Sequence, residues 1–146
     1  MADEARINSS LQIRISNGDT VLLDYTSRPN SFTADVSGTK GPSPGAFSVP
    51  VTGKIINLEE LVQPGLYRIS NLDATNFFEY GIYDPQTDLF YPWGECLPGE
   101  SYIGRFSRNI MEEYLSTGTG TTGSTNRIFL KANTAAVVAL LEAFEV

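Results

Sequence analysis

Acidic side chains are the groups in this sequence with the clearest capacity for chemistry. Five of them fall in one stretch: Glu79, Asp84, Asp88, Glu95 and Glu100. Two carboxylates held about 5 to 9 Å apart can hydrolyse a glycosidic bond, and Glu79 with Glu95 is the pair to consider. However, Asp84 and Asp88 bracket a Pro-Gln-Thr turn and Glu100 follows a Pro-Gly turn, where acids stabilise turn geometry. We therefore expect these carboxylates to serve turns and solvation rather than catalysis.

Oxygen ligands in the same region raise the question of a calcium site. Asp73, Asn76, Asp84 and Asp88 carry the hard oxygen donors that Ca²⁺ prefers. Their spacing matches no known calcium-binding loop, so turn chemistry accounts for them better. We predict no metal site and no cofactor.

Other catalytic groups are scarce in the sequence. The chain has no histidine and a single cysteine, Cys96. Ser-His-Asp and Cys-His machinery and the histidine-containing zinc sites are therefore excluded. No nearby cation would lower the pKa of Cys96, so we expect a buried structural thiol. We predict that the protein is not an enzyme.

Aromatic side chains are concentrated between residues 77 and 93. In alternating strands about half of them must point inward to fill a core. We take Tyr83, Phe90, Tyr91 and Trp93 as the candidates to face outward and bind a partner or ligand. A protein partner and a sugar both remain open, because aromatic surfaces are frequent in interface hot spots and in stacking sites.

The segments that must position these groups read as short strands. Residues 11–16 and 21–25 alternate apolar and polar side chains around Asn17-Gly18-Asp19, which predicts a β-hairpin. Similar runs follow at 32–36, 47–51, 67–72, 77–83, 89–93, 102–107, 127–132 and 136–144. About nine to eleven strands with turns between them predict an all-β fold: a single-domain antiparallel β-sandwich or jelly-roll-like module, with at most one or two short helices.

A few positions refine this prediction. Pro50 lacks a backbone donor and places the strand at 47–51 at a sheet edge. Asn57 as an N-cap and Pro64-Gly65 as a stop predict a short helix over residues 57–62. The mostly apolar segment 135–144 predicts a central strand buried on both faces. Residues 37–45 and 116–126 are rich in Gly, Ser, Thr or Pro and predict surface loops.

Charge and terminal sequence limit the possible partners. Seventeen acidic against ten basic residues give a formal charge of -7, which disfavours nucleic acid and anionic membranes. The N-terminal residues show no signal peptide, and no apolar run is long enough to span a membrane. We assign residues 1–10 to a polar N-terminal arm and 11–146 to the β-sandwich domain. The arm and the loop at 37–45 are the elements expected to reach a partner.

The second half of the chain has a recognisable order of strands and turns. Residues 67–73 lead through Thr75-Asn76 into 77–84, then to Pro98-Gly99-Glu100, to Lys131-Ala132-Asn133-Thr134 and to an apolar C-terminal strand. This order resembles small β-sandwich virion proteins of tailed bacteriophages, of the auxiliary head, decoration or tail-associated type. The resemblance covers residues 67–146 and assigns no functional residue.

The resemblance implies a non-enzymatic structural protein of the virion, made in the bacterial host cytoplasm. We expect a capsid decoration or auxiliary head subunit that binds the major capsid protein or another virion protein as a homo-oligomer, with a trimer as the first expectation. One alternative is a tail- or neck-associated virion protein. A second is a carbohydrate- or receptor-binding β-sandwich module that uses the four outward aromatic residues.

Overall fold

A computed structural model describes residues 4–35, 41–61, 63–107 and 127–145 of the chain. These residues form twelve β-strands and no helix, and every strand pair is antiparallel. The all-β prediction is therefore confirmed. The chain divides into two compact units, residues 1–37 and residues 38–146.

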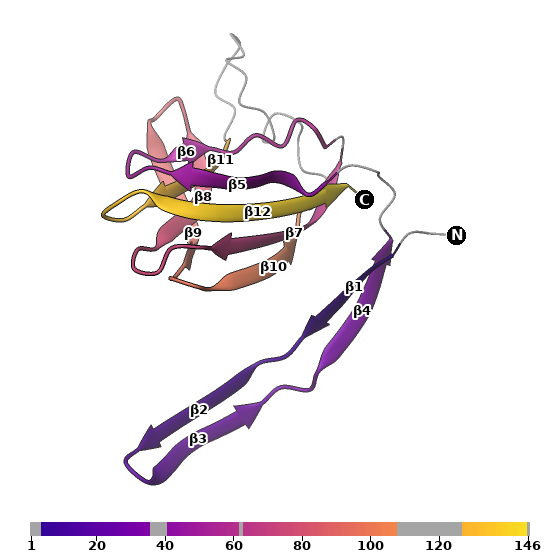
Figure 1. The fold of residues 1–146 in the computed structure, drawn as a ribbon, viewed down its shortest axis with the longest axis vertical. Coiled ribbons are helices and arrows are strands. Elements are labelled where there is room, and N and C mark those ends of the chain that lie inside the picture. The colour runs from indigo at the N-terminus through magenta and orange to yellow at the C-terminus, as the bar shows by residue number, and fades with distance from the viewer. Residues whose placement is uncertain (1–3, 36–40, 62, 108–126, 146) are drawn as a thin grey trace. The chain divides into compact units, whose positions relative to one another are not determined.

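The first unit contains a two-stranded ribbon, which we call the ribbon arm (residues 4–35; Figure 1). Strand β1 (Glu4–Ser9) pairs with β4 (Asn30–Asp35), and β2 (Gln12–Asn17) pairs with β3 (Thr20–Thr26). Ser27 connects the two ladders by donating its N–H to the Leu11 carbonyl at 2.8 Å. The tip is the predicted Asn-Gly hairpin turn, in which Gly18 has a φ of 60° that glycine adopts at low cost.

The second unit is a sandwich of two four-stranded sheets (Figure 1). The β12 sheet has the order β10-β7-β12-β5, and the β8 sheet has the order β6-β11-β8-β9. Their strands are β5 (Ser43–Val49), β6 (Lys54–Ile55), β7 (Pro64–Asn71), β8 (Phe78–Asp84), β9 (Leu89–Cys96), β10 (Ser101–Arg105), β11 (Arg127–Ala132) and β12 (Val137–Glu145). The β-sandwich prediction is confirmed for this unit.

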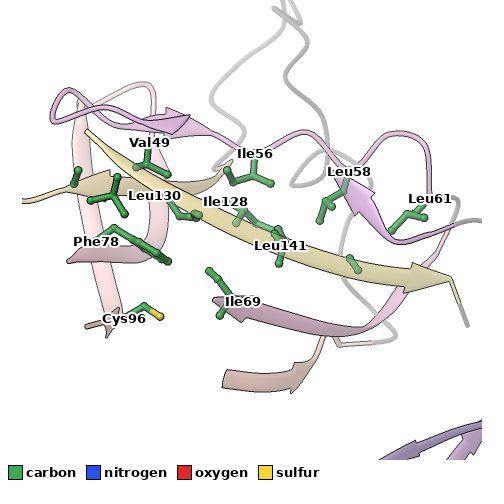
Figure 2. Packing of buried hydrophobic residues seen from close by; sticks show 14 residues of the cluster. Val49, Ile56, Leu58, Leu61, Ile69, Phe78, Cys96, Ile128, Leu130 and Leu141 are labelled. Carbon is green, nitrogen blue, oxygen red and sulfur yellow. The ribbon is translucent and has the colours of Figure 1, made fainter. Parts of the chain in front are cut away.

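The core lies between the two sheets and uses the alternation of strand side chains. Val49, Ile69 and Leu141 point in from the β12 sheet, and Phe78, Cys96, Ile128 and Leu130 point in from the β8 sheet (Figure 2). Ile56, Leu58 and Leu61 come from the irregular segment between β6 and β7 and are also buried. Strands β5 and β6 are edge strands of their sheets. At this side of the core the irregular segment, and not another strand, supplies the buried side chains among the described residues.

Two predictions about individual strands have different outcomes. Strand β5, which precedes Pro50, is an edge strand of its sheet, as predicted. Strand β12 is central as predicted, but only one of its faces is buried. Val137, Ala139 and Leu141 point into the core, whereas Val138 between them is exposed. The apolar run misled the prediction because residues on the outer face of this sheet are also apolar.

Three further predictions need correction. The predicted sandwich boundary at residue 11 lies too early: strands β2 to β4 pair within the ribbon arm, and the sandwich unit begins at residue 38. The predicted helix at 57–62 is a turn over its described residues, in which Leu61 donates to the Leu58 carbonyl. Residues 43–45 of the predicted loop belong to β5, because they pair with Leu141, Glu142 and Ala143 of β12. The predicted loop at 116–126 lies outside the described residues.

Candidate functional site

The ribbon arm carries an apolar face. Ile13 lies directly opposite Tyr25, and Ile15 lies directly opposite Leu23. Because side chains directly opposite each other share a face, these four lie on one side of the ribbon. Leu11 directly precedes β2 and continues the alternation of Ile13 and Ile15. We call Leu11, Ile13, Ile15, Leu23 and Tyr25 the apolar face.

The opposite face of the ribbon arm is mostly polar between residues 12 and 26, and Val21, which lies opposite Ser16, is an exposed apolar exception. Gln12 lies opposite Thr26, and Arg14 lies opposite Asp24, which places one positive and one negative side chain on directly opposing residues. The register shifts at Leu22, so this residue belongs to a bulge near the tip. Apolar and polar residues alternate along these strands, and successive side chains point to opposite faces. The ribbon therefore has two chemically different sides.

Within the two-stranded ribbon no third strand covers the apolar face. Every residue of β2 and β3 is exposed, and the five residues of the apolar face keep between 38% and 53% of their surface accessible. An isolated two-stranded hairpin is marginally stable in water, and contiguous exposed apolar side chains mark interaction surfaces. The ribbon arm is therefore the part of the described chain that most needs a partner.

Two of the predicted aromatic site residues, Tyr83 and Phe90, pack together on the outer face of the β8 sheet. They lie on directly opposite residues of β8 and β9, and both contact the ring of Phe129, with ring centroids 4.9 and 5.1 Å from it. Both side chains are half-buried, and Phe129 is buried. Tyr83 and Phe90 therefore form part of a small packed cluster rather than a free stacking surface.

The other two, Tyr91 and Trp93, lie away from that cluster. Tyr91 is directly opposite Ile82, which points to the core side, so Tyr91 shares that side of the β8 sheet. Trp93 lies in a bulge of β9, and its ring meets the ring of Tyr80 edge-on, with centroids 6.1 Å apart. Trp93 keeps 58% of its surface exposed. Tyr83 and Phe90 therefore lie on the other face of the β8 sheet from Tyr91, and the four aromatic candidates form no common platform.

Most of the candidate carboxylates serve turns. Asp73 accepts backbone N–H bonds from Asn76 and Thr75, which lower its pKa. Asp84 accepts bonds from the Thr87 hydroxyl and the Gln86 N–H, which lower its pKa. Both carboxylates therefore stabilise the turns in which they lie.

Asp88 and Glu100 also accept hydrogen bonds. Asp88 accepts the hydroxyl proton of Tyr83 at 2.7 Å, and this bond raises the pKa of Tyr83. Glu100 accepts bonds from the Tyr102 hydroxyl and the Leu97 N–H, which lower its pKa, and its bond raises the pKa of Tyr102 to about 12. The bond from Leu97 agrees with the turn role predicted for Glu100, whereas Tyr83 and Tyr102 are strand residues.

Glu79 and Glu95 are brought together by the strand register. They lie directly opposite each other on β8 and β9, and Lys131 of β11 lies opposite Glu79 on its other side. Their neighbours Phe78 and Cys96 point into the core, so both glutamates face outward from the sheet. In the described part of the chain no three His, Cys, Asp or Glu side chains are grouped so that they could hold a metal ion.

Cys96 is a buried free thiol, as the sequence predicted. Its Sγ donates to the Glu100 carbonyl at 3.3 Å. Burial raises the pKa of the thiol to about 11. At neutral pH it is therefore protonated, and it offers no nucleophile.

The sequence reasoning missed the apolar face as a surface. It predicted the hairpin and its alternation, but assigned the apolar side to a sandwich core. Local sequence patterns do not show that residues 4–9 pair with residues 30–35. This pairing extends the hairpin on the side away from its turn. In this ribbon each strand pairs only with the other one, so no further strand or sheet of the ribbon covers the apolar face.

The fold and this surface define a class: a β-sandwich unit that carries a separate two-stranded arm with an apolar face. No family model, no curated protein and no solved structure matches the chain. The described residues contain no helix that is long and apolar enough to cross a membrane.

Proposed function

We propose that this protein is a non-enzymatic structural subunit of a larger protein assembly and that the ribbon arm attaches it there. The observation that carries this proposal is the apolar face of the arm, which nothing within the ribbon covers. An exposed apolar face on a two-stranded ribbon gains stability when it is buried against another chain. The carboxylates that occupy turns are consistent with a role that involves no catalysis.

The assembly that we propose is the virion of a tailed bacteriophage, with the chain as a capsid decoration or auxiliary head subunit. The order of strands and turns from residue 67 onwards supports this choice. A position at the tail or neck is the alternative, and it differs only in the virion protein that the chain neighbours.

The test is quantitative mass spectrometry of gradient-purified virus particles from cells that produce the chain together with its virus. We expect the wild-type chain in the particles at many copies, at a fixed ratio to the major capsid protein. Ile13→Asp places a charge on the apolar face and should reduce incorporation at least tenfold. Gln12→Asp places the same charge on the adjacent residue of the polar face and should be incorporated normally. A wild-type chain found only in the particle-free fraction would reject the proposal.

A second candidate function, carbohydrate binding, is favoured by one observation. Tyr91 and Trp93 expose more than half of their surfaces on the edge strand β9. Exposed aromatic rings can stack on sugar rings. Binding to a glycan array that Trp93→Ala abolishes and Phe90→Ala leaves unchanged would support this function, and an array without signal would count against it.

A further inference from the structure

The composition of the apolar face indicates which surface covers it. We propose that it is covered by the same face of a second copy of this chain, so that two ribbon arms pack face to face around a two-fold axis. This inference rests on the proposed function, in which the arm is the attachment element. It identifies the chain that the arm contacts in the assembly as a neighbouring copy, so the apolar face is buried between two subunits and not against another virion protein.

The area of the face suits this partner. Five large side chains that are about half exposed present on the order of 100 Å² each, or about 500 Å² for one arm. Two such faces together bury at most about 1,000 Å², which is the size of a weak and reversible protein interface. A single face against a flat polar surface would bury less apolar area.

The charged residues nearest to the apolar face permit self-association. Between residues 12 and 26 the charged residues are Arg14, Asp19 and Asp24. Arg14 and Asp24 oppose each other on the polar face, and Asp19 lies in the tip turn. No charge lies on the apolar face, so two copies bring no like charges together when these faces meet. This matters because the whole chain carries a formal charge of -7.

Symmetry and strand geometry are also satisfied. A two-fold interface requires a surface that complements itself. An uncharged apolar face on one side of the ribbon meets this requirement. Two ribbons stacked about 10 Å apart form a four-stranded sandwich, in which each two-stranded hairpin gains the covering layer that it lacks alone. The pairs Ile13 with Tyr25 and Ile15 with Leu23 would form the centre of this layer.

The first experiment measures the mass of the full chain by analytical ultracentrifugation over a wide range of concentrations. We expect a reversible dimer for the wild type and for Gln12→Asp. Ile13→Asp should raise the dimer dissociation constant about 100-fold, because two charges meet across the two-fold axis. A wild-type chain that stays monomeric, forms a trimer, or is weakened equally by both substitutions would overturn the proposal.

A milder pair of variants guards against unfolding of the arm. Ile13 is the middle of the three apolar residues on its side of the ribbon, so a central two-fold axis brings its two copies close together. Ile13→Cys should be linked into dimers by a bismaleimide that spans about 10 Å, the spacing of packed sheets. Gln12→Cys should not be linked, since both ribbons would separate its two copies. Cys96 is buried and protonated and should not react. Equal linking of both variants would overturn the proposal.

The two proposals fail in different ways. A chain that is monomeric in solution yet enters virus particles through the apolar face would reject arm pairing and retain the proposed function. A chain that dimerises through the arm but is absent from particles would retain arm pairing and reject the virion assignment.

Discussion

Asn71 provides the sharpest test of how the sandwich unit is held together. Its side chain is buried at the end of β7 and makes three hydrogen bonds. The Nδ2 group donates to the carbonyls of Asn76 and Cys96, each at 2.9 Å, and Oδ1 accepts the Asp73 N–H at 2.9 Å. Because β7 and β9 belong to different sheets, the bond to Cys96 links the two layers. No other residue type offers two donors and an acceptor in this small space.

Replacing Asn71 by alanine removes all three bonds and leaves buried backbone groups without these partners. At about 1 kcal/mol for each bond, the expected loss of unfolding free energy is about 3 kcal/mol. With a urea dependence near 2 kcal/mol per molar, the midpoint should fall by about 1.5 M. Trp93 is the only tryptophan and lies in the sandwich, so its fluorescence reports the unfolding of this unit.

Two further variants separate the hydrogen bonds from packing. Asn71→Asp keeps the volume but turns an oxygen towards two carbonyls, so at neutral pH it should destabilise the unit at least as much as alanine does. Asn57 makes a comparable bond with the Glu59 N–H at an exposed turn, and Asn57→Ala should cost less than about 1 kcal/mol. If Asn71→Ala costs no more than Asn57→Ala, the link through Asn71 does not stabilise the sandwich and the reasoning is wrong.

Three other predictions follow from the sandwich unit. Gly81→Ala should destabilise it by about 3 kcal/mol in the same urea assay, because the added Cβ would lie 2.1 Å from the Tyr91 carbonyl oxygen, and an unchanged midpoint would contradict this close backbone approach. Cys96 should resist a thiol reagent near pH 8 in the native protein and react in urea, since burial raises its pKa to about 11; rapid native labelling would show that the core opens. The pKa of Asp73 is lowered in the folded state, so its contribution to stability is present above its unfolded pKa of about 3.8 and is lost as the pH falls through its folded pKa. Asp73→Asn should therefore give a shallower decline of unfolding free energy below about pH 4, and an identical decline would refute the role of its turn bonds.

Much of the sandwich could be predicted from local patterns. The strand segments from 67 to 144 were placed to within a few residues, because alternation and turn residues are properties of neighbouring positions. The turn roles of Asp84 and Glu100 followed from the adjacent proline and glycine for the same reason. Cys96 was expected to be a buried structural thiol, because no cation near it in the sequence would make it reactive.

The aromatic candidates show where such patterns stop being informative. Tyr83 and Phe90 contact Phe129, which lies 46 and 39 residues further along the chain and belongs to β11, on the side of β8 away from β9. The bulge at Trp93 then moves this residue out of simple alternation. Which aromatic rings meet therefore depends on strand order and on the bulge, and neither can be read from the spacing of residues.

The sequence by itself determined the all-β class, the positions of most strands, the hairpin at Asn17-Gly18 and the absence of histidine-based chemistry. These depend on composition and on contacts between near neighbours. Only the tertiary structure decided that residues 4–35 close into a ribbon of their own and that the sandwich starts at residue 38. The same alternating pattern serves a strand in a sandwich core and a strand in a separate arm. The difference lies in which distant strand it pairs with, and in the ribbon arm that choice leaves Ile13, Ile15, Leu23 and Tyr25 on an exposed face.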